Sequence, residues 1–237
     1  MDAFTGKATV YAQARPSYAL AALDYIFALL CCNCAKPDKI FADIGAGTGK
    51  FTSLLAKRAE KAYAIEPNED MRTQIKPYEN IHVIDGTAEA TTLPKQSVDA
   101  ITCAQAFHWF DVPRFKQECE RILKPGGRVF VLYNSYVGNF KHDELIWHSP
   151  ENQPNSFFTE REERLRHFFG SNMTRTTFPN DIYYDAEHWL AYMLSHSSSP
   201  RPGDADYDRF VESVQLIFAR YNQDGKLHRP LETVVYT

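Results

Sequence analysis

Long apolar runs are missing from this chain of 237 residues. No uninterrupted stretch approaches the roughly 18–20 apolar residues that a membrane-spanning helix needs. Residues 1–7 also lack the basic-then-apolar layout of a secretion signal. These absences predict a cytoplasmic protein without a membrane partner.

An excess of positive charge is missing as well. Lysine and arginine together number 26 against 30 acidic residues, which gives a formal net charge of −4. Proteins that grip the phosphate backbone of a nucleic acid cluster their basic residues. The charge balance therefore predicts no nucleic-acid partner.

Cysteine is scarce, with five residues in the chain. Cys31, Cys32 and Cys34 form a cluster, but a structural zinc site usually needs four ligands from two such pairs. The other two, Cys103 and Cys119, are isolated, and the cluster follows an apolar helical pattern. We therefore expect reduced, buried thiols and no metal site.

Apolar residues make up 44% of the chain, enough to bury a substantial core in a single domain spanning 1–237. From residue 39 to 134, short apolar runs alternate with helical stretches. This alternation predicts an α/β fold, a doubly wound, Rossmann-like sheet of parallel strands with helices on both faces. The loops after the strands then share one edge, where ligands bind. The expected strands are Ile40–Ile44, Ala62–Glu66, Ile81–Asp85, Val98–Cys103 and Arg128–Tyr133, and the expected helices include Lys50–Ala59 and Arg114–Leu123.

The pattern changes after Asn134. Residues 138–170 are polar and aromatic, with charged helical character over Glu160–Phe169, which predicts a helical cap inserted into the domain. Residues 171–237 are expected to complete the sheet and to form the substrate side. The elements expected there are a strand over Thr174–Tyr184 interrupted at Pro179, helices over Asp185–His196 and Asp204–Asn222, and a final strand over Leu231–Thr237.

The segment Phe41–Phe51 is a short apolar strand that runs into a glycine-rich turn and then into a helix. A phosphate-binding P-loop would need glycine at Ile44 and Ser or Thr at Phe51, so an NTPase is disfavoured. A dinucleotide site would need glycine at Lys50, which weakens an NAD or FAD site. The acidic-x-Gly-x-Gly-x-Gly pattern of Asp43–Gly49 fits a nucleoside cofactor, and an ordinary turn without a ligand is the remaining alternative.

The next strand ends in a carboxylate. Glu66 lies seventeen positions after Gly49, with Pro67 directly behind it. An acid at this place in a doubly wound fold accepts hydrogen bonds from ribose hydroxyls. An exposed acid at a strand end is the alternative, but its position behind the glycine turn favours ribose binding.

Four segments in this order resemble the class I methyltransferases that use S-adenosylmethionine. More narrowly, they resemble the small-molecule branch akin to trans-aconitate methyltransferases. The segments are Tyr11–Tyr18, Asp43–Gly49, Gly86–Glu89 with Leu93-Pro94, and Ala104–Asp111. The resemblance implies a seven-stranded sheet whose last strand, the tail of this chain, is antiparallel.

The resemblance also implies residue roles. Gln105 would lie near the sulfonium of the cofactor and Met71 would pack on its adenine. Thr87 stands where many relatives have Asp, so the adenine contact would fall to the amide of Ala88. Residues 1–38 would form an N-terminal helical lid, whose contacts could equally be helix-entry packing, and residues 39–134 the cofactor-binding half. The cofactor-binding residues so implied are Tyr11, Arg15, Asp43, Gly45, Ala46, Gly47, Glu66, Pro67, Met71, Thr87, Ala88 and Gln105.

Methyl transfer from a sulfonium is an in-line displacement, so the protein mainly supplies alignment. A general base is needed only for an acceptor that is protonated at working pH. His108 is the candidate base, with packing among aromatic residues as the alternative, and Trp109 either walls the substrate pocket or belongs to the core. Further polar candidates on the substrate side are Asn134 and His196 with Ser195 and Ser197.

Motifs of nucleic-acid methyltransferases are absent. Gln105–His108 replaces the Asn/Asp-Pro-Pro-Tyr-like run of amino-methylating enzymes, and no Cys follows any proline. The sequence predicts methyl transfer to a small molecule, with a carboxylate among the candidate acceptor groups, by a monomer or homodimer. The alternatives are a non-catalytic S-adenosylmethionine-binding module and an NAD-dependent oxidoreductase.

Overall fold

The structure, a computed structural model, describes residues 8–30, 38–137, 154–196 and 198–237, with the backbone alone over 154–159. The cluster of Cys31, Cys32 and Cys34 and the candidate Ser197 lie outside the described residues.

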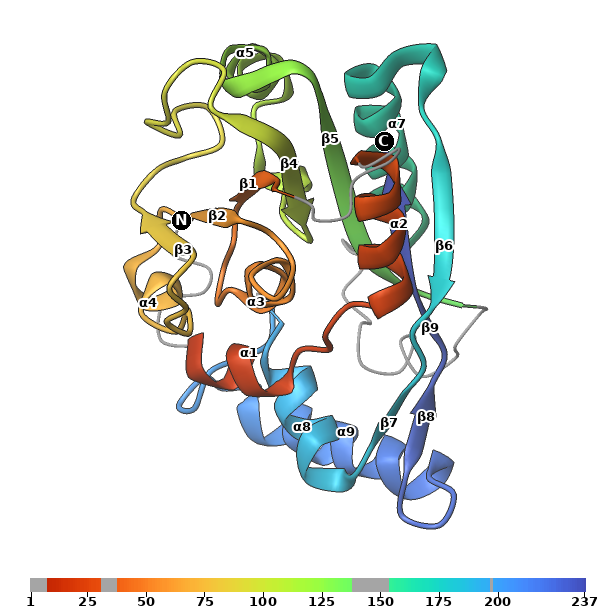
Figure 1. The fold of residues 1–237 in the computed structure, drawn as a ribbon. Helices are drawn as coiled ribbons and strands as arrows, with labels where there is room; N and C mark the ends of the chain where they lie inside the picture. Colours follow the sequence, from red (N-terminus) through yellow and green to blue (C-terminus); the bar gives the residue numbers. More distant parts are fainter. Residues whose placement is uncertain (1–7, 31–37, 138–153, 197) are drawn as a thin grey trace.

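A seven-stranded sheet in the order β3-β2-β1-β4-β5-β9-β6 forms the centre of the molecule (Figure 1). Strands β1 to β5 pair in parallel, whereas β9 is antiparallel to both β5 and β6. The predicted doubly wound sheet with the tail as its antiparallel strand is therefore confirmed. The strands are β1 (Ile40–Ile44), β2 (Lys61–Ile65), β3 (Ile81–Ile84), β4 (Val98–Ala104), β5 (Leu123–Tyr136), β6 (Arg175–Pro179) and β9 (Leu231–Tyr236).

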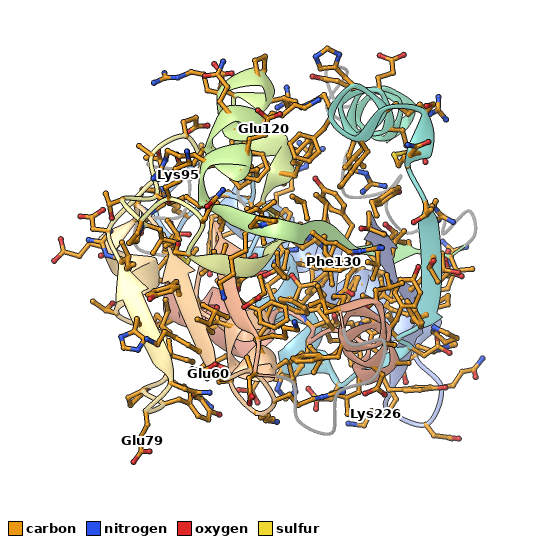
Figure 2. The ribbon with its side chains drawn as sticks, turned by 45° about the horizontal axis from the view of Figure 1, so that its top comes forward. Glu60, Glu79, Lys95, Glu120, Phe130 and Lys226 are labelled. Atoms are coloured by element: carbon orange, nitrogen blue, oxygen red, sulfur yellow. The ribbon has the colours of Figure 1, made fainter. Side chains whose placement is uncertain are left out.

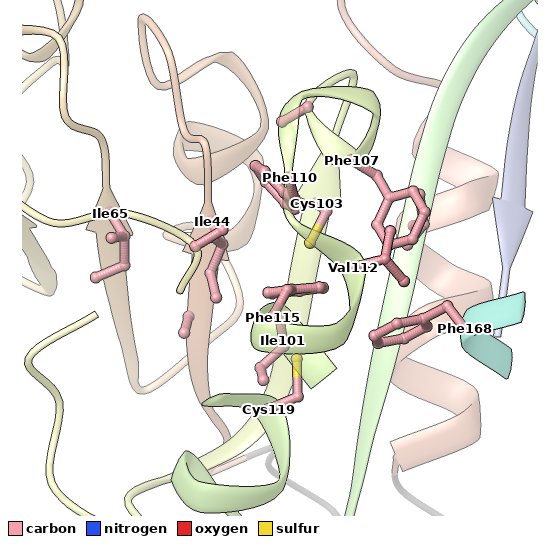
Figure 3. Close-up of a cluster of buried hydrophobic side chains, with 14 of the residues drawn as sticks. Ile44, Ile65, Ile101, Cys103, Phe107, Phe110, Val112, Phe115, Cys119 and Phe168 are labelled. Carbon is pink, nitrogen blue, oxygen red and sulfur yellow. The ribbon is translucent and has the colours of Figure 1, made fainter. Parts of the chain in front are cut away.

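Side chains alternate between the two faces of each strand, and each face is covered by its own helices. Phe41 and Phe130 face α2 (Leu20–Leu30) and α3 (Lys50–Leu55). Ile44 and Val131 face the opposite side, where Phe107, Phe110 and Phe115 form an aromatic cluster around α5 (Val112–Ile122) (Figure 3). Strands buried on both faces explain the nearly continuous apolar runs in the sequence.

Helix α7 (Pro154–Phe169) is the described part of the expected helical insertion. Its Leu165 and Phe168 are buried in the same core as α5, and the Phe168 ring stacks on Phe115 with centroids 5.4 Å apart. The helix therefore covers the sheet beside α5, and it also sends one side chain, Arg161, to the cavity described below.

A separate group of elements lies at one end of the sheet and is called the cap here (Figure 1). It has its own apolar core, centred on Trp189, Tyr192 and Val214, and the indole nitrogen of Trp189 donates to the Val214 carbonyl at 3.1 Å. Its elements are α1 (Ala8–Ala14), α8 (Ala186–Leu194), α9 (Tyr207–Tyr221) and the antiparallel strand pair β7 (Ile182–Tyr184) with β8 (Leu227–Arg229). The remaining short elements are α4 (Glu69–Arg72), η2 (Phe107–Trp109) and η3 (Gly170–Asn172).

Charged side chains such as Glu60, Glu79 and Lys95 lie at the periphery, whereas Phe130 lies inside (Figure 2). None of the helices described is long and apolar enough to cross a membrane. Among the described residues, no group of three or more His, Cys, Asp or Glu side chains could hold a metal ion.

Candidate active site

A cavity of about 520 Å³ opens at the carboxyl ends of the strands, between the sheet and the cap. It is lined by the loops after β1, β2, β3 and β4 and by the last residues of β5, together with residues in or directly after α1, α7 and α8. Every predicted site residue except Asp43 lines it, as do both catalytic candidates. Those residues are Tyr11, Arg15, Gly45, Ala46, Gly47, Glu66, Pro67, Met71, Thr87, Ala88, Gln105, His108 and Trp109.

The glycine turn forms one wall of the cavity. The amides of Gly45 and Ala46 both donate to the Ile65 carbonyl, at 2.9 and 3.0 Å, which locks the turn to the end of β2. Gly45 has φ of 68°, and a Cβ there would lie 2.5 Å from the Cβ of Ala106. Gly47 has φ of 56° with nothing within 4 Å of an added Cβ, so the backbone at Gly47 borders open space. A ligand can approach this backbone closely.

Glu66 faces the glycine turn directly. One carboxylate oxygen accepts from the Gly47 amide at 2.8 Å, and the other accepts from the Asn68 amide at 2.9 Å. Burial raises the pKa of Glu66, and these two amide bonds oppose that shift. Each carboxylate oxygen can accept a second hydrogen bond, so Glu66 retains capacity for the hydroxyls of a ribose. The glycine turn and Glu66 therefore lie side by side in the cavity lining, and the binding of ribose by Glu66 stays a prediction.

Asp43 corrects the sequence prediction, because it does not line the cavity. Its side chain is buried in the sheet, where it accepts from the hydroxyls of Thr52 at 2.6 Å and Thr102 at 2.8 Å. Burial raises its pKa to about 6 despite these bonds. Asp43 lies within β1 opposite Thr102 on β4, so its side chain points to a face of the sheet rather than to its edge. It ties β1 to β4 and α3 instead of contacting a cofactor.

Met71 on α4 is buried and also lines the cavity. Thr87 and Ala90 exchange two backbone hydrogen bonds of 3.2 Å, and this tight turn brings Ala88 and Glu89 to the cavity. The place is suited to a flat apolar group such as a base. Met71 and Ala88 therefore give the cavity apolar lining in addition to the carboxylate of Glu66.

Gln105 follows β4 at the centre of the cavity. Its φ of 59° is unusual for a residue with a side chain. Its amide donates to the Leu132 carbonyl at 2.9 Å, and its side-chain nitrogen donates to the Asn134 carbonyl at 3.1 Å. These bonds hold the strained turn in place beside the glycine wall.

His108 lies in the short helix η2 that follows. Burial, together with the charges of Arg161 and Arg164, lowers its pKa to about 4. The imidazole is therefore neutral at pH 7. Its ring lies 5.0 Å from the ring of Trp109, which is 58% exposed at the cavity and so belongs to its wall rather than to the core.

Arg161 is a cavity residue that the sequence analysis missed. It is only 8% exposed, and its guanidinium lies 4.4 Å from the centre of the Tyr133 ring. Nearby Arg164 donates to the Phe110 carbonyl at 2.5 Å. Arg161 stands in a helix of mixed charge over 160–169, and nothing in that pattern separates it from its exposed neighbours.

The cap contributes the last wall. The Arg15 guanidinium lies 5.1 Å from the Tyr11 ring and 5.3 Å from the Tyr192 ring, and it donates to the Ser195 carbonyl at 3.4 Å. His196 lines the cavity, and burial followed by the charge of Arg15 lowers its pKa to about 3. Ser195, by contrast, is buried and donates to the Tyr192 carbonyl at 2.6 Å, away from the cavity lining.

Part of this chain matches a known type of domain. Residues 42–131 match the model of a methyltransferase domain. An uncharacterised methyltransferase of Mycobacterium bovis is 36% identical over 126 residues, which cover 53% of this chain and 49% of the relative. Malonyl-[acyl-carrier protein] O-methyltransferase of Methylococcus capsulatus is 35% identical over 143 residues, covering 55% of this chain and 51% of the relative. The chain thus spans about half the length of these curated relatives.

A solved structure supports the fold over nearly the whole chain. The S-adenosylmethionine-dependent methyltransferase from Thiobacillus denitrificans, in complex with S-adenosylhomocysteine, superposes with a TM-score of 0.54 at 15% identity. The match covers 98% of this chain and 97% of the other. The narrower resemblance to trans-aconitate methyltransferases stays a prediction. Residues 42–131 thus form a methyltransferase domain, and the solved structure supports the fold of the chain around it.

Proposed function

We propose that the protein transfers the methyl group of S-adenosylmethionine to a carboxylate of a small molecule. When bound, the cofactor supplies a methyl group already activated by the sulfonium. The glycine turn at 45–47, Glu66 and Met71 would hold its adenosyl part. Gln105 and His108 would then border the point of transfer, with the acceptor on the side of Arg161.

The proposal that the methyl acceptor is a carboxylate rests on the buried positive charge of the cavity. Arg161 and Arg15 both line the cavity, on α7 and beside α1. The charges of Arg161 and Arg164 also lower the pKa of His108, so the potential around this imidazole is positive. A guanidinium matches the geometry of a carboxylate and is less strongly hydrated than an ammonium, which suits a buried recognition site. An anionic acceptor would be stabilised there.

The state of His108 agrees with an acceptor that needs no deprotonation. A group with a pKa of about 4 is a weak base at pH 7. A carboxylic acid has a pKa near 4 in water and is already ionised at that pH. We therefore assign His108 to orienting the acceptor rather than to removing a proton, and Trp109 to walling the acceptor side. Rate enhancement then comes from alignment for in-line displacement.

The name of one relative also supports a carboxylate as the acceptor group. Its name states O-methylation of a malonyl group on a carrier protein, and a malonyl group carries a free carboxylate. The match covers only about half of that protein. It supports the chemical type of the acceptor and not its identity.

The test is a screen of small acids with purified protein and S-adenosylmethionine. Each carboxylic acid is paired with its amide and its alcohol, and formation of S-adenosylhomocysteine and of the methyl ester is measured. We expect turnover with acids only. Turnover with the amides or the alcohols but not with the acids would overturn the carboxylate assignment. Binding of S-adenosylhomocysteine without turnover on any acceptor would favour the non-catalytic binding module.

Arg161 provides the matching variant. Arg161→Met should lower kcat/KM for the acid by about tenfold or more, the size of a lost charged hydrogen bond, with unchanged affinity for S-adenosylhomocysteine. Arg166→Met is the control, because Arg166 lies on the same helix but its side chain is 65% exposed and pairs with Glu162. Cytoplasmic location and a monomeric or homodimeric state stay predictions.

A further inference from the structure

Asn134 is a cavity residue at the end of β5 whose side chain joins three other segments. Its amide nitrogen donates to the Ser17 carbonyl at 3.0 Å. Its amide oxygen accepts from the Thr233 hydroxyl at 2.7 Å and from the Asn180 side chain at 3.2 Å. Asn180 also donates to the same Ser17 carbonyl, at 2.9 Å. A single side chain thus connects residues far apart in the sequence.

The orientation of the Asn134 amide follows from its partners. The Ser17 carbonyl can only accept, so the amide nitrogen must face it. The Thr233 hydroxyl accepts from the Ala19 amide at 2.9 Å, which leaves its own hydrogen for the oxygen of Asn134. A side chain at this position must therefore donate at one end and accept at the other. Among side chains of this length, only asparagine does both.

Ser17 and Ala19 belong to the segment that links α1 to α2. Helix α1 brings Tyr11 to the cavity, and Arg15 follows directly behind the helix. Arg15 ties this link to the rest of the cap, because it donates to the Ser195 carbonyl and lies against the Tyr192 ring. Two residues later, Ser17 ties the same link to the sheet through Asn134. Both attachments therefore act on the link that follows α1.

Asn134 also contacts Gln105, which the proposed function puts beside the point of methyl transfer. Its backbone carbonyl accepts from the side chain of Gln105 at 3.1 Å. Gln105 is the residue with positive φ that follows β4 and borders the glycine wall. One residue therefore meets both the segment carrying α1 and the centre of the cavity.

We infer that Asn134 is a positioning residue, which holds α1 over the bound cofactor and aligns it with Gln105. The expected effect on catalysis rests on the proposed function. The attachment of α1 by Asn134 does not depend on a ligand or on the reaction. Loss of the Asn134 side-chain amide should make the link at 16–19 more mobile. The part of the cavity wall that Tyr11 and Arg15 form should then become more mobile too.

Hydrogen exchange on the full-length protein tests this attachment. In the wild type we expect slow exchange of the amides of α1, slower still with S-adenosylhomocysteine. Asn134→Ala should speed the exchange of α1 by about tenfold or more and weaken S-adenosylhomocysteine binding by about tenfold, the equivalent of one to two hydrogen bonds. Asn134→Asp keeps the acceptor atoms but loses the donor to Ser17, so it should behave like Asn134→Ala in α1.

Asn80→Ala is the matched control. Asn80 donates to the Ala56 and Ala59 carbonyls, both at 2.9 Å, outside the cavity lining. It should lose folding stability while exchange in α1 stays as in the wild type. If Asn134→Ala does not fold, Thr233→Val removes the same hydroxyl bridge and should give the faster α1 exchange.

Wild-type exchange rates in α1 of Asn134→Ala or Thr233→Val, with or without ligand, would overturn the inference. If the wild type does not bind S-adenosylhomocysteine, the proposed function fails. The exchange comparison without ligand still tests the attachment of α1 in that case.

Discussion

Asp43 and Glu66 show how the same chemical group takes different roles on two consecutive strands of the chain. Asp43 lies within β1, so its carboxyl faces into the sheet and meets two threonine hydroxyls. Glu66 comes directly after β2, where a side chain is free to face the edge of the sheet. The sequence placed both at the cofactor. The signal that could have separated them is Thr102, a polar residue in register with Asp43 on the neighbouring strand β4.

Glu66→Gln should lower the affinity for S-adenosylhomocysteine by about tenfold or more, measured by calorimetry. The physical reason is that one amide NH₂ must then face the backbone donor of Gly47 or Asn68, so a charged hydrogen bond is replaced by repulsion. Glu69→Gln, an exposed neighbour in α4, is the control and should bind as the wild type does. Unchanged affinity in Glu66→Gln would remove this residue from the cofactor site.

Asp43 predicts a dependence of stability on pH. Its folded pKa is raised to about 6 by burial, above the roughly 3.9 of an unfolded aspartate. Folding therefore favours the neutral carboxyl. That contribution is fully present below about pH 4 and is lost as the pH rises through about 6.

Asp43→Asn should consequently gain stability relative to the wild type as the pH rises from 4 to 7. Two pKa units correspond to a limit of about 3 kcal/mol in the free energy of unfolding. Urea unfolding at several pH values measures this difference, with the exposed Asp38→Asn as control. A stability difference that does not change with pH would show that Asp43 is ionised in the folded protein.

His108 predicts the shape of the pH–rate profile. Its pKa of about 4 leaves it neutral from pH 7 to 9, and a carboxylate acceptor is ionised throughout that range. The value of kcat/KM should therefore vary by no more than about twofold between pH 7 and 9. A rise approaching tenfold per pH unit would mean that the acceptor must lose a proton, and the carboxylate assignment would fail.

At the scale of elements, the glycine turn makes the sharpest prediction. Gly45→Ala combines a left-handed φ with a Cβ placed 2.5 Å from Ala106, so it should lose well over the 1–2 kcal/mol of backbone strain. Gly47→Ala has the strain without a contact, and its Cβ would enter the cavity. It should lose only about 1–2 kcal/mol of stability but bind S-adenosylhomocysteine weakly.

Gly126→Ala is the control for Gly47→Ala. Gly126 also has positive φ and nothing within 4 Å of an added Cβ, but it lies away from the cavity. It should lose similar stability in urea unfolding with no change in ligand affinity. Equal loss of affinity in both variants would show that the Gly47 backbone does not approach the ligand.

The sequence was most informative about elements in the first half of the chain. Strands buried on both faces give apolar runs that end at polar or glycine residues, and β1 was predicted with its observed bounds, Ile40–Ile44. The three-residue strand β8 gave no such signal, since it pairs only with β7, far away in the sequence. The predicted helix Lys50–Ala59 stops at Leu55, because the chain turns there toward β2.

The site residues also divide into those that the sequence pattern could predict and those that it could not. Residues in loops after parallel strands could be placed from the strand pattern, because those loops must share an edge. Arg161 could not be placed in this way. The face that α7 turns toward the cavity is set by the packing of Leu165 and Phe168 in the same core as α5. Asn134 was noticed as a polar residue after a strand. Its network could not be foreseen, because its partners come from segments far apart in the chain.

At the scale of the whole molecule, the cavity lies between the sheet and the cap. The loops of the sheet line one side, and the cap supplies Tyr192 and His196. Charged residues of the lining divide in the same way. Glu66 and Glu89 lie on the sheet side, whereas Arg15 and Arg161 come from elements that cover the sheet. This division is the one that the proposed function needs, with an adenosyl group beside the sheet and an anionic acceptor beside the two arginines.

The most direct test of this account is a thermal melt of the purified protein with increasing S-adenosylhomocysteine, run beside NAD and ATP. A ligand that binds only the folded state adds stability of about RT ln(1 + [L]/Kd). We predict a melting temperature that rises with the logarithm of the S-adenosylhomocysteine concentration and does not respond to NAD or ATP. No shift with S-adenosylhomocysteine at millimolar concentration, or a shift with NAD instead, would contradict the assignment of the cavity.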